Sequence, residues 1–230
     1  MKKLGLIGGM GPVSTIDYYQ KLIAGFQQDH PQSCPPIVID SLDVFELLKL
    51  EEQNDRAKLF RQLETSIENL TAAGAEYAAL TANTPHMIFD ELQAASPIPL
   101  ISILDPVGEA IKNHQQKKVA LLGTKMTMKL PFYFHGLAKQ GIEVIAPASH
   151  QIQTIHQIIT TELEENIFNP ASKQVILQII AELKAKENVQ GIILGCTELP
   201  RLLNQTDCQQ ITIYDTVALH VNKLLAKMEN

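Results

Sequence analysis

The chain has few of the features that mark membrane-bound and nucleic-acid-binding proteins. Among its 230 residues, 19 are Lys or Arg and 25 are Asp or Glu, which gives a formal net charge of −6 without any basic block. Nucleic acid and anionic membrane surfaces are therefore not expected as partners. The longest apolar runs have about six residues, whereas a membrane-spanning helix needs about 20. We expect no membrane segment.

Cysteine is also scarce, with three residues at Cys34, Cys196 and Cys208. An odd number at irregular spacing predicts reduced thiols rather than a disulfide framework. The seven histidines show no paired ligand spacing, since His150 and His156 are six residues apart, so no metal site is expected. The apolar part of residues 1–10 is too short for a signal peptide, and we expect a cytoplasmic protein.

Short apolar runs alternate with amphipathic helical stretches along the whole sequence. Helical spacing of apolar residues is clearest over 59–70, and a second long helix is expected over 172–186. Such an alternation is typical of a parallel α/β architecture. Strands are expected at 3–7, 37–39, 77–80, 100–103, 118–122, 143–146, 191–195 and 211–214.

The stretch 191–200 holds the main candidate for chemistry. Its apolar run ends at Gly195, and Cys196, Thr197 and Glu198 follow directly. In open α/β sheets, ligands bind outside the carboxyl ends of the strands. The segment alone leaves two interpretations open, a catalytic thiol and an inert buried cysteine, because free cysteine is among the most buried residue types.

A glycine-rich turn at 8–12 lies between the first expected strand and a helix that begins near Ser14 or Thr15. The dinucleotide fingerprint would need its third glycine at position 14, which is Ser14, so a nucleotide site is disfavoured. Free backbone N–H groups at such a helix start would suit a carboxylate equally well.

The sequence repeats itself weakly. Residues 2–8 resemble 117–123, and residues 79–84 resemble 193–198, at nearly equal offsets. We therefore predict two similar α/β halves, although chance similarity of short apolar strands is the alternative. The predicted first domain is 1–104 plus 214–230, and the second is 105–213. A cleft between them would bring Ala82 and Cys196 to opposite sides of one ligand.

Five segments together resemble the aspartate/glutamate racemase family over nearly the whole chain. They are Gly5–Pro12 with Thr15, Tyr18 and Tyr19; Asn83–His86; Gly123–Thr124 with Thr127; Gly195–Leu199; and Asp215–Thr216 with His220. The resemblance implies two pseudo-symmetric Rossmann- or flavodoxin-like parallel-sheet domains with the active site in the cleft between them, and a last helix that returns to the first domain. It also implies a racemase that needs no cofactor and uses one thiol from each half.

By this resemblance Cys196 exchanges the proton at the substrate Cα, and the substrate is an amino acid or dicarboxylate, in the first place aspartate or glutamate. Glu198 or His86 would tune the thiol or hold the amino group, and the alternatives left open are a helix N-cap contact for Glu198 and an ordinary buried hydrogen bond for His86. A homodimer is expected, although the apolar helix face of Tyr18, Tyr19, Leu22 and Phe26 also suits core packing. The substrate-binding residues implied are Met10, Gly11, Asn83, Thr84, Thr124, Thr197 and Glu198.

The sequence departs from the family pattern at its most important position. Two-thiol members carry Cys directly before Asn-Thr, where this chain has Ala82, and a methyl group cannot transfer a proton. Thr81 should point to the opposite side of the strand. Where relatives tend to place a cation or amide for the substrate carboxylate, this chain has Glu51 and Glu165. The nearest cations are Lys49, Arg56 and Lys125.

Three functions therefore compete. The first is an amino-acid racemase, for acidic substrates or of altered specificity, in which Cys196 is one base and water, His86 or another group replaces the lost thiol. The second is a one-thiol lyase or isomerase, in which Cys196 protonates a planar intermediate. The third is a ligand-binding homologue without turnover.

Overall fold

The computed structural model describes residues 1–53 and 55–229, apart from the side chains of residues 51 and 52. The expected position of Glu51 thus has its side chain outside the described part. The chain divides into two compact units, one formed by Met1–Ile103 with His220–Asn230 and the other by Leu104–Leu219. The return to the first unit comes at His220, later than the expected residue 214, because the last strand still belongs to the second sheet.

The first unit is built on a parallel sheet in the order β2-β1-β3. Its strands are β1 (Leu4–Gly8), β2 (Ile37–Ser41) and β3 (Tyr77–Leu80). The strand expected at 100–103 does not form, since Leu100 makes only one bridge, to Ala78, before the chain turns into the next helix. This bridge still places the segment beside β3, where a fourth strand would lie.

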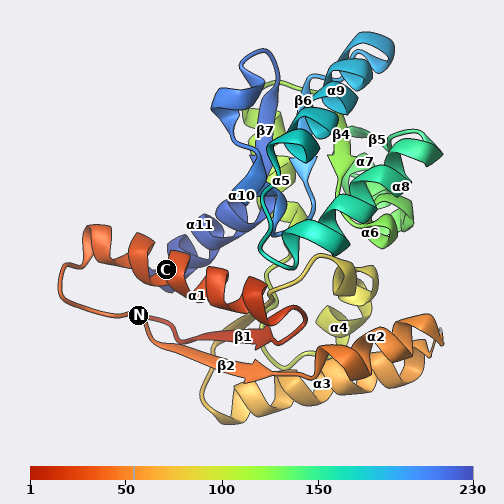
Figure 1. The fold of residues 1–230 in the computed structure, drawn as a ribbon. Helices are drawn as coiled ribbons and strands as arrows, with labels where there is room; N and C mark the ends of the chain where they lie inside the picture. The colour runs from red at the N-terminus through yellow and green to blue at the C-terminus, as the bar shows by residue number, and fades with distance from the viewer. Residues whose placement is uncertain (54, 230) are drawn as a thin grey trace. The chain divides into compact units, whose positions relative to one another are not determined.

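Helix α1 (Pro12–Asp29) covers one face of this sheet and α3 (Arg56–Ala72) covers the other (Figure 1). Ile7, Ala78 and Leu80 share one core cluster with Leu63 and Leu70 of α3, as expected for alternate residues that point to one face. The remaining elements of this unit are α2 (Val44–Glu52), a 3-10 helix (Thr84–Ile88), α4 (Phe89–Ala95) and the end of α11 (Thr216–Glu229).

The second unit contains a four-stranded parallel sheet in the order β5-β4-β6-β7. The strands are β4 (Lys118–Leu122), β5 (Glu143–Ile145), β6 (Gly191–Leu194) and β7 (Thr212–Asp215). The helices are α5 (Leu104–Asn113), α6 (Lys125–Lys129), α7 (Pro131–Ala138), α8 (Ser149–Ile158), a π-helix (Ile159–Leu163), α9 (Pro170–Glu187), α10 (Leu199–Leu202) and a 3-10 helix (Gln205–Cys208).

Alternation along β4 divides the second core into two layers. Val119 and Leu121 pack with α5 and α7, whereas Ala120 and Leu122 pack with α8 and α9. A strand that is buried on both faces reads as a continuous apolar run, which is how the sequence revealed it.

Both units place their first strand between the second and the third, so β1, β2 and β3 correspond in order to β4, β5 and β6. The predicted fold class of two parallel-sheet α/β domains is confirmed. In the described part of the chain, no helix combines the length and apolar character that crossing a membrane requires.

Candidate functional site

The turn between β1 and α1 forces the backbone into a conformation that suits glycine. Gly9 has φ 81°, and a Cβ there would lie 2.0 Å from the backbone oxygen of Leu42. The amide of Gly9 donates to the hydroxyl of Thr15 at 2.9 Å, so it is engaged within the fold. Gly11, with φ 107°, precedes Pro12 at the first helical position and gives α1 no side-chain cap.

Thr81, which follows β3, is fully buried and holds this turn in place. Its hydroxyl donates to the backbone oxygen of Ile7 and lies 3.1 Å from the hydroxyl of Thr15, and its own carbonyl accepts from Ser14. Thr81 is therefore committed to the interior of the first unit, in agreement with its predicted orientation. It does not replace a missing catalytic group.

Ala82 comes next and has 8% of its surface exposed. It borders a cavity of about 80 Å³ that is contained within the first unit. Two other residues implied as substrate-binding, Met10 and Thr84, line the same cavity. The rest of the lining comes from Val44, Leu47, Leu48, Leu59 and Pro85. Met10, Ala82 and Thr84 therefore border one space within the first unit.

His86 does not serve as a spare proton carrier in this structure. Its Nδ1 lies 3.0 Å from the backbone oxygen of Ala82, and its Nε2 accepts from the backbone amide of Ile103 at 3.1 Å. A ring with one nitrogen facing a carbonyl and the other facing an N–H is a neutral imidazole protonated at Nδ1. Burial lowers its pKa to about 4, so His86 acts as a brace for the 82–86 segment.

In the second unit, Cys196 lies just beyond the carboxyl end of β6 and has 7% of its surface exposed. Its thiol donates to Oε2 of Glu198 at 2.8 Å. Burial raises the pKa of this thiol well above its ordinary value, and the negative charge of Glu198 together with its hydrogen bond acts in the same direction. Cys196 is therefore a protonated thiol paired with a carboxylate.

Two glycines allow the chain after β4 and the chain after β6 to approach each other closely. A Cβ on Gly195 would lie 2.8 Å from Leu121 Cδ1, and a Cβ on Gly123 would lie 3.1 Å from the backbone oxygen of Gly195. Because β4 and β6 are neighbours, Thr124 lies at the strand end beside that of Cys196. Thr124 caps α6, and its hydroxyl oxygen accepts a hydrogen bond from the amide of Thr127 at 3.3 Å. One of the hydrogen bonds that this hydroxyl can make therefore stabilises the helix start.

Thr197 and Glu198 are half-buried directly after the thiol, and Glu198 precedes α10. Asn83 is buried at the start of the 3-10 helix after β3, where its backbone oxygen accepts from the amide of His86. The residues implied as substrate-binding therefore gather at strand ends in each unit. They are Met10, Gly11, Asn83 and Thr84 in the first unit, and Thr124, Thr197 and Glu198 in the second.

Sequence reasoning missed Glu164. Helix α8 changes into a π-helix at Ile159, and the amide of Glu164 donates to the oxygen of Ile159, five residues back. The pKa of Glu164 is raised, first by desolvation and then by the negative charges of Glu198 and Glu165. Its charge also raises the pKa of Cys196. The expected residue Glu165 lies one position further along.

The three cations named from the sequence do not complete a carboxylate site in the described residues. Arg56 bonds Oε1 of Glu91 at 2.6 Å, and Lys49 is exposed and absent from the cavity lining. Lys125 is exposed at the start of α6.

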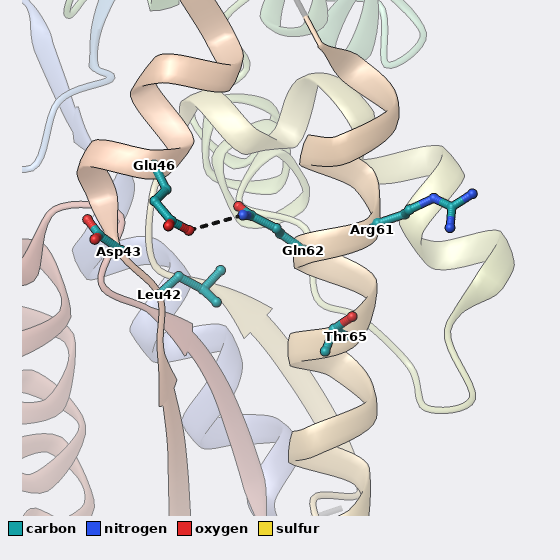
Figure 2. A pocket seen from close by; sticks show the side chains of 6 residues that line it. All are labelled: Leu42, Asp43, Glu46, Arg61, Gln62 and Thr65. Atoms are coloured by element: carbon teal, nitrogen blue, oxygen red, sulfur yellow. Dashed lines mark hydrogen bonds between the residues drawn. The ribbon is translucent and has the colours of Figure 1, made fainter.

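A second hollow, of about 270 Å³, lies between α2 and α3 on the first unit. Figure 2 shows Glu46 and Gln62 joined across it by a hydrogen bond of 3.3 Å, while Arg61 points away from them. None of the residues implied by the family resemblance lines it. In the described residues, no group of three or more His, Cys, Asp or Glu side chains is arranged to hold a metal ion.

Comparisons with known proteins decide the family. The Asp/Glu/hydantoin racemase model matches residues 7–224. The chain belongs to the Asp/Glu/hydantoin racemase family.

Among members of this family, RacX of Bacillus subtilis, a broad specificity amino-acid racemase, is 29% identical over 94% of this chain and 93% of its own. Two solved structures, each 34% identical with full coverage of both chains, are similar as well. A putative Asp/Glu racemase from Yersinia pestis superposes with a TM-score of 0.94, and an aspartate racemase homologue from Pyrococcus horikoshii with 0.89. The predicted racemase, an isomerase acting on amino acids, is confirmed at the level of the family.

Proposed function

We propose that this protein exchanges the proton at the Cα of an amino acid through Cys196, with Glu198 as the partner of the thiol and without a cofactor. The observation that carries the proposal is the 2.8 Å hydrogen bond from the thiol to Glu198 at the end of β6. A parallel α/β sheet binds its ligands at this end of its strands.

The Cys196–Glu198 pair accounts for every proton that moves during exchange at Cα. In one direction the S–H proton of Cys196 passes to Glu198, and the thiolate then takes the proton from Cα, leaving its electron pair on the substrate. In the other direction the S–H bond breaks as a C–H bond forms on the planar carbanion. Because burial and Glu198 hold the thiol protonated, proton delivery is the easier direction in the ligand-free protein.

The family resemblance also implies residues in each unit that would bind the substrate carboxylate. Donors aimed at the substrate carboxylate stabilise the charge that develops when Cα loses its proton. In the second unit we assign this role to Thr197 and Thr124. In the first unit the corresponding candidates are Asn83 and the backbone amides of Met10 and Gly11. The amide of Gly9 is excluded from that set because it bonds to Thr15.

Inversion also requires a second proton carrier, and Ala82, at the position where two-thiol family members carry Cys, supplies none. His86, the side chain considered as a substitute, has both ring nitrogens bonded to backbone. We therefore propose exchange at Cα with little inversion. The one-thiol lyase and the binding homologue without turnover remain the alternatives.

The experiment incubates the protein in deuterium oxide with L-amino acids and follows deuterium at Cα by mass spectrometry and D-isomer formation by chiral chromatography. Cys196→Ser should abolish exchange. Cys208→Ser is the matched control, because Cys208 is a second buried cysteine in the same core, and it should keep exchange. Ala82→Cys should raise inversion by about 10²-fold or more, the range contributed by a positioned proton carrier.

Each outcome separates the candidates. Rapid formation of the D-isomer by the natural sequence, at a kcat of about 1–10³ per second, would contradict the claim that Ala82 disables one face. Cys196-dependent loss of a leaving group instead of exchange would favour the lyase. Binding with neither exchange nor elimination in any variant would favour the binding homologue.

We also propose a substrate and a cellular location. Aspartate or glutamate as substrate is supported by the names of similar structures, one of them the aspartate racemase of Picrophilus torridus, which is 22% identical. A cytoplasmic location is supported by three free cysteines.

A homodimer is supported by apolar side chains exposed along α1, namely Val13, Ile16 and Tyr19. The face considered from the sequence is mostly core, because Tyr18, Leu22 and Phe26 are buried. Light scattering of the natural sequence and of Ile16→Glu tests the dimer, which the charge should dissociate.

A further inference from the structure

The cavity beside Ala82 has a mostly apolar lining. Val44, Leu47 and Leu48 contribute from α2 and Leu59 from α3, and Thr84 is the one polar side chain among the described residues that line it. No described lining residue is charged. This is the reverse of what recognition of a second carboxylate requires, which is a cation or a set of N–H donors.

We propose that this cavity binds the apolar side chain of a neutral amino acid, so that the protein prefers such substrates to aspartate and glutamate. The inference rests on the proposed function, in which position 82 belongs to the substrate site. It replaces the acidic substrate expected from the resemblance with the substrate class that the lining fits.

The volume sets the size of the side chain. A cavity needs only about 10–15 Å³ of such volume to hold one water, so a cavity of about 80 Å³ has room for several non-hydrogen atoms. This matches the side chains of valine, leucine or methionine in part or in full. A carboxylate placed there would lose its water without gaining a partner, which is unfavourable.

The cations outside the lining do not change this conclusion. Arg56 is bonded to Glu91 and to the backbone oxygen of Met87, which lies 3.5 Å away. On α2, positions 44, 47 and 48 share one face, and Lys49 is turned by about 100° from Leu48 on the helix.

The test uses two variants on the same helix. Leu48 lines the cavity and is 49% exposed, so Leu48→Arg brings a cation to the cavity without burying it deeply. Phe45→Arg is the matched control, because Phe45 is 78% exposed, lies on α2 and does not line the cavity. Both variants add the same charge to α2.

Two readouts separate this inference from the proposed function. The first is deuterium exchange at Cα with L-valine, L-leucine, L-methionine, L-aspartate, L-glutamate and L-lysine. The second is calorimetric binding of the same six amino acids to the Cys196→Ser protein, which does not depend on turnover.

For the natural sequence we expect kcat/KM or affinity at least about tenfold higher for the best apolar amino acid than for aspartate, the scale on which apolar pockets discriminate. Leu48→Arg should reduce that ratio about tenfold or reverse it, and Phe45→Arg should leave it unchanged. Preference of the natural sequence for aspartate, glutamate or lysine, or equal effects of the two variants, would overturn the inference.

If none of the six amino acids exchanges but apolar ones bind the Cys196→Ser protein selectively, the proposed function fails and the cavity inference stands. If aspartate exchanges fastest, the proposed function stands and the cavity inference fails. If none exchanges and none binds, both are overturned.

Discussion

Mild acid should destabilise the first unit through two buried histidines. His86 and His220 are both buried, with ring centroids 6.3 Å apart. Nε2 of His220 lies 3.0 Å from the backbone oxygen of Ile101, and Nδ1 lies 2.9 Å from the hydroxyl of Tyr18. Each ring therefore has both nitrogens engaged as a neutral imidazole, and protonation would cost an accepted hydrogen bond.

The magnitude follows from the two pKa values. Burial lowers the pKa of His86 to about 4; burial and then the neighbouring charge of His86 lower that of His220 to about 3. The unfolded chain, with imidazole pKa values near 6.5, therefore binds more protons below that pH. The stabilisation is complete above pH 6.5 and falls as pH falls towards 4 and 3. At pH 5 the free energy of unfolding is lower by about 2 kcal/mol for each ring, or about 4 kcal/mol in total. A typical domain has a free energy of unfolding of about 5–15 kcal/mol, so this decrease is a large part of it.

Urea unfolding followed by circular dichroism at pH 7, 6 and 5 measures this dependence. His86→Asn and His220→Gln should each unfold more easily at pH 7, yet each should lose about 2 kcal/mol less than the natural sequence between pH 7 and 5. His150→Gln, at an exposed position, is the control and should follow the natural sequence. A free energy of unfolding that stays constant from pH 7 to pH 5 would refute the reasoning, as would equal slopes for all three variants.

Three further predictions concern the strand ends. Gly9→Ala should destabilise the protein by about 2 kcal/mol or more in urea unfolding, because the new methyl would meet Leu42 at a positive φ. Glu198→Gln should lower the pKa of the Cys196 thiol, so alkylation by iodoacetamide at pH 8 should quicken while Cα exchange falls about tenfold or more. Thr216→Val should cost about 1–3 kcal/mol in the same unfolding assay, because the buried oxygen of Leu194 loses its 2.9 Å donor.

Local sequence patterns predicted most of the architecture. Apolar runs located the strands from β1 to β7. The runs are clearest for β1, β3, β4 and β6, because strands buried on both faces leave no polar positions to obscure them. The exception is 100–103, whose apolar run is as clear as the others. No strand forms there because Ser102 and Ile103 already connect to α5, which begins at Leu104. The composition of the segment suits a strand, but the short connection to the helix prevents it.

The candidate site residues were named in two ways. Cys196 was named because it comes directly after an apolar run, whereas Met10, Ala82 and Thr84 were implied by the family resemblance, and their part in substrate binding stays a prediction. The role of His86 could not be predicted, because its partner Ile103 is 17 residues away and only packing joins them. Glu164 was missed because a π-helix shifts the residues after it around the helix, and no composition rule marks where such a shift begins.

The two equivalent strand ends have diverged in chemistry. After β6 the chain places a thiol against a carboxylate, a pair that can hold and release a proton. After β3, at the equivalent position, it places a methyl beside an apolar cavity. If the halves descend from one duplicated unit, loss of a proton carrier at position 82 removes chemistry from the first strand end and leaves side-chain recognition. Leu48→Arg should then change substrate preference without restoring inversion. Ala82→Cys should restore inversion and, because position 82 also lines the cavity, should narrow the space for the substrate side chain.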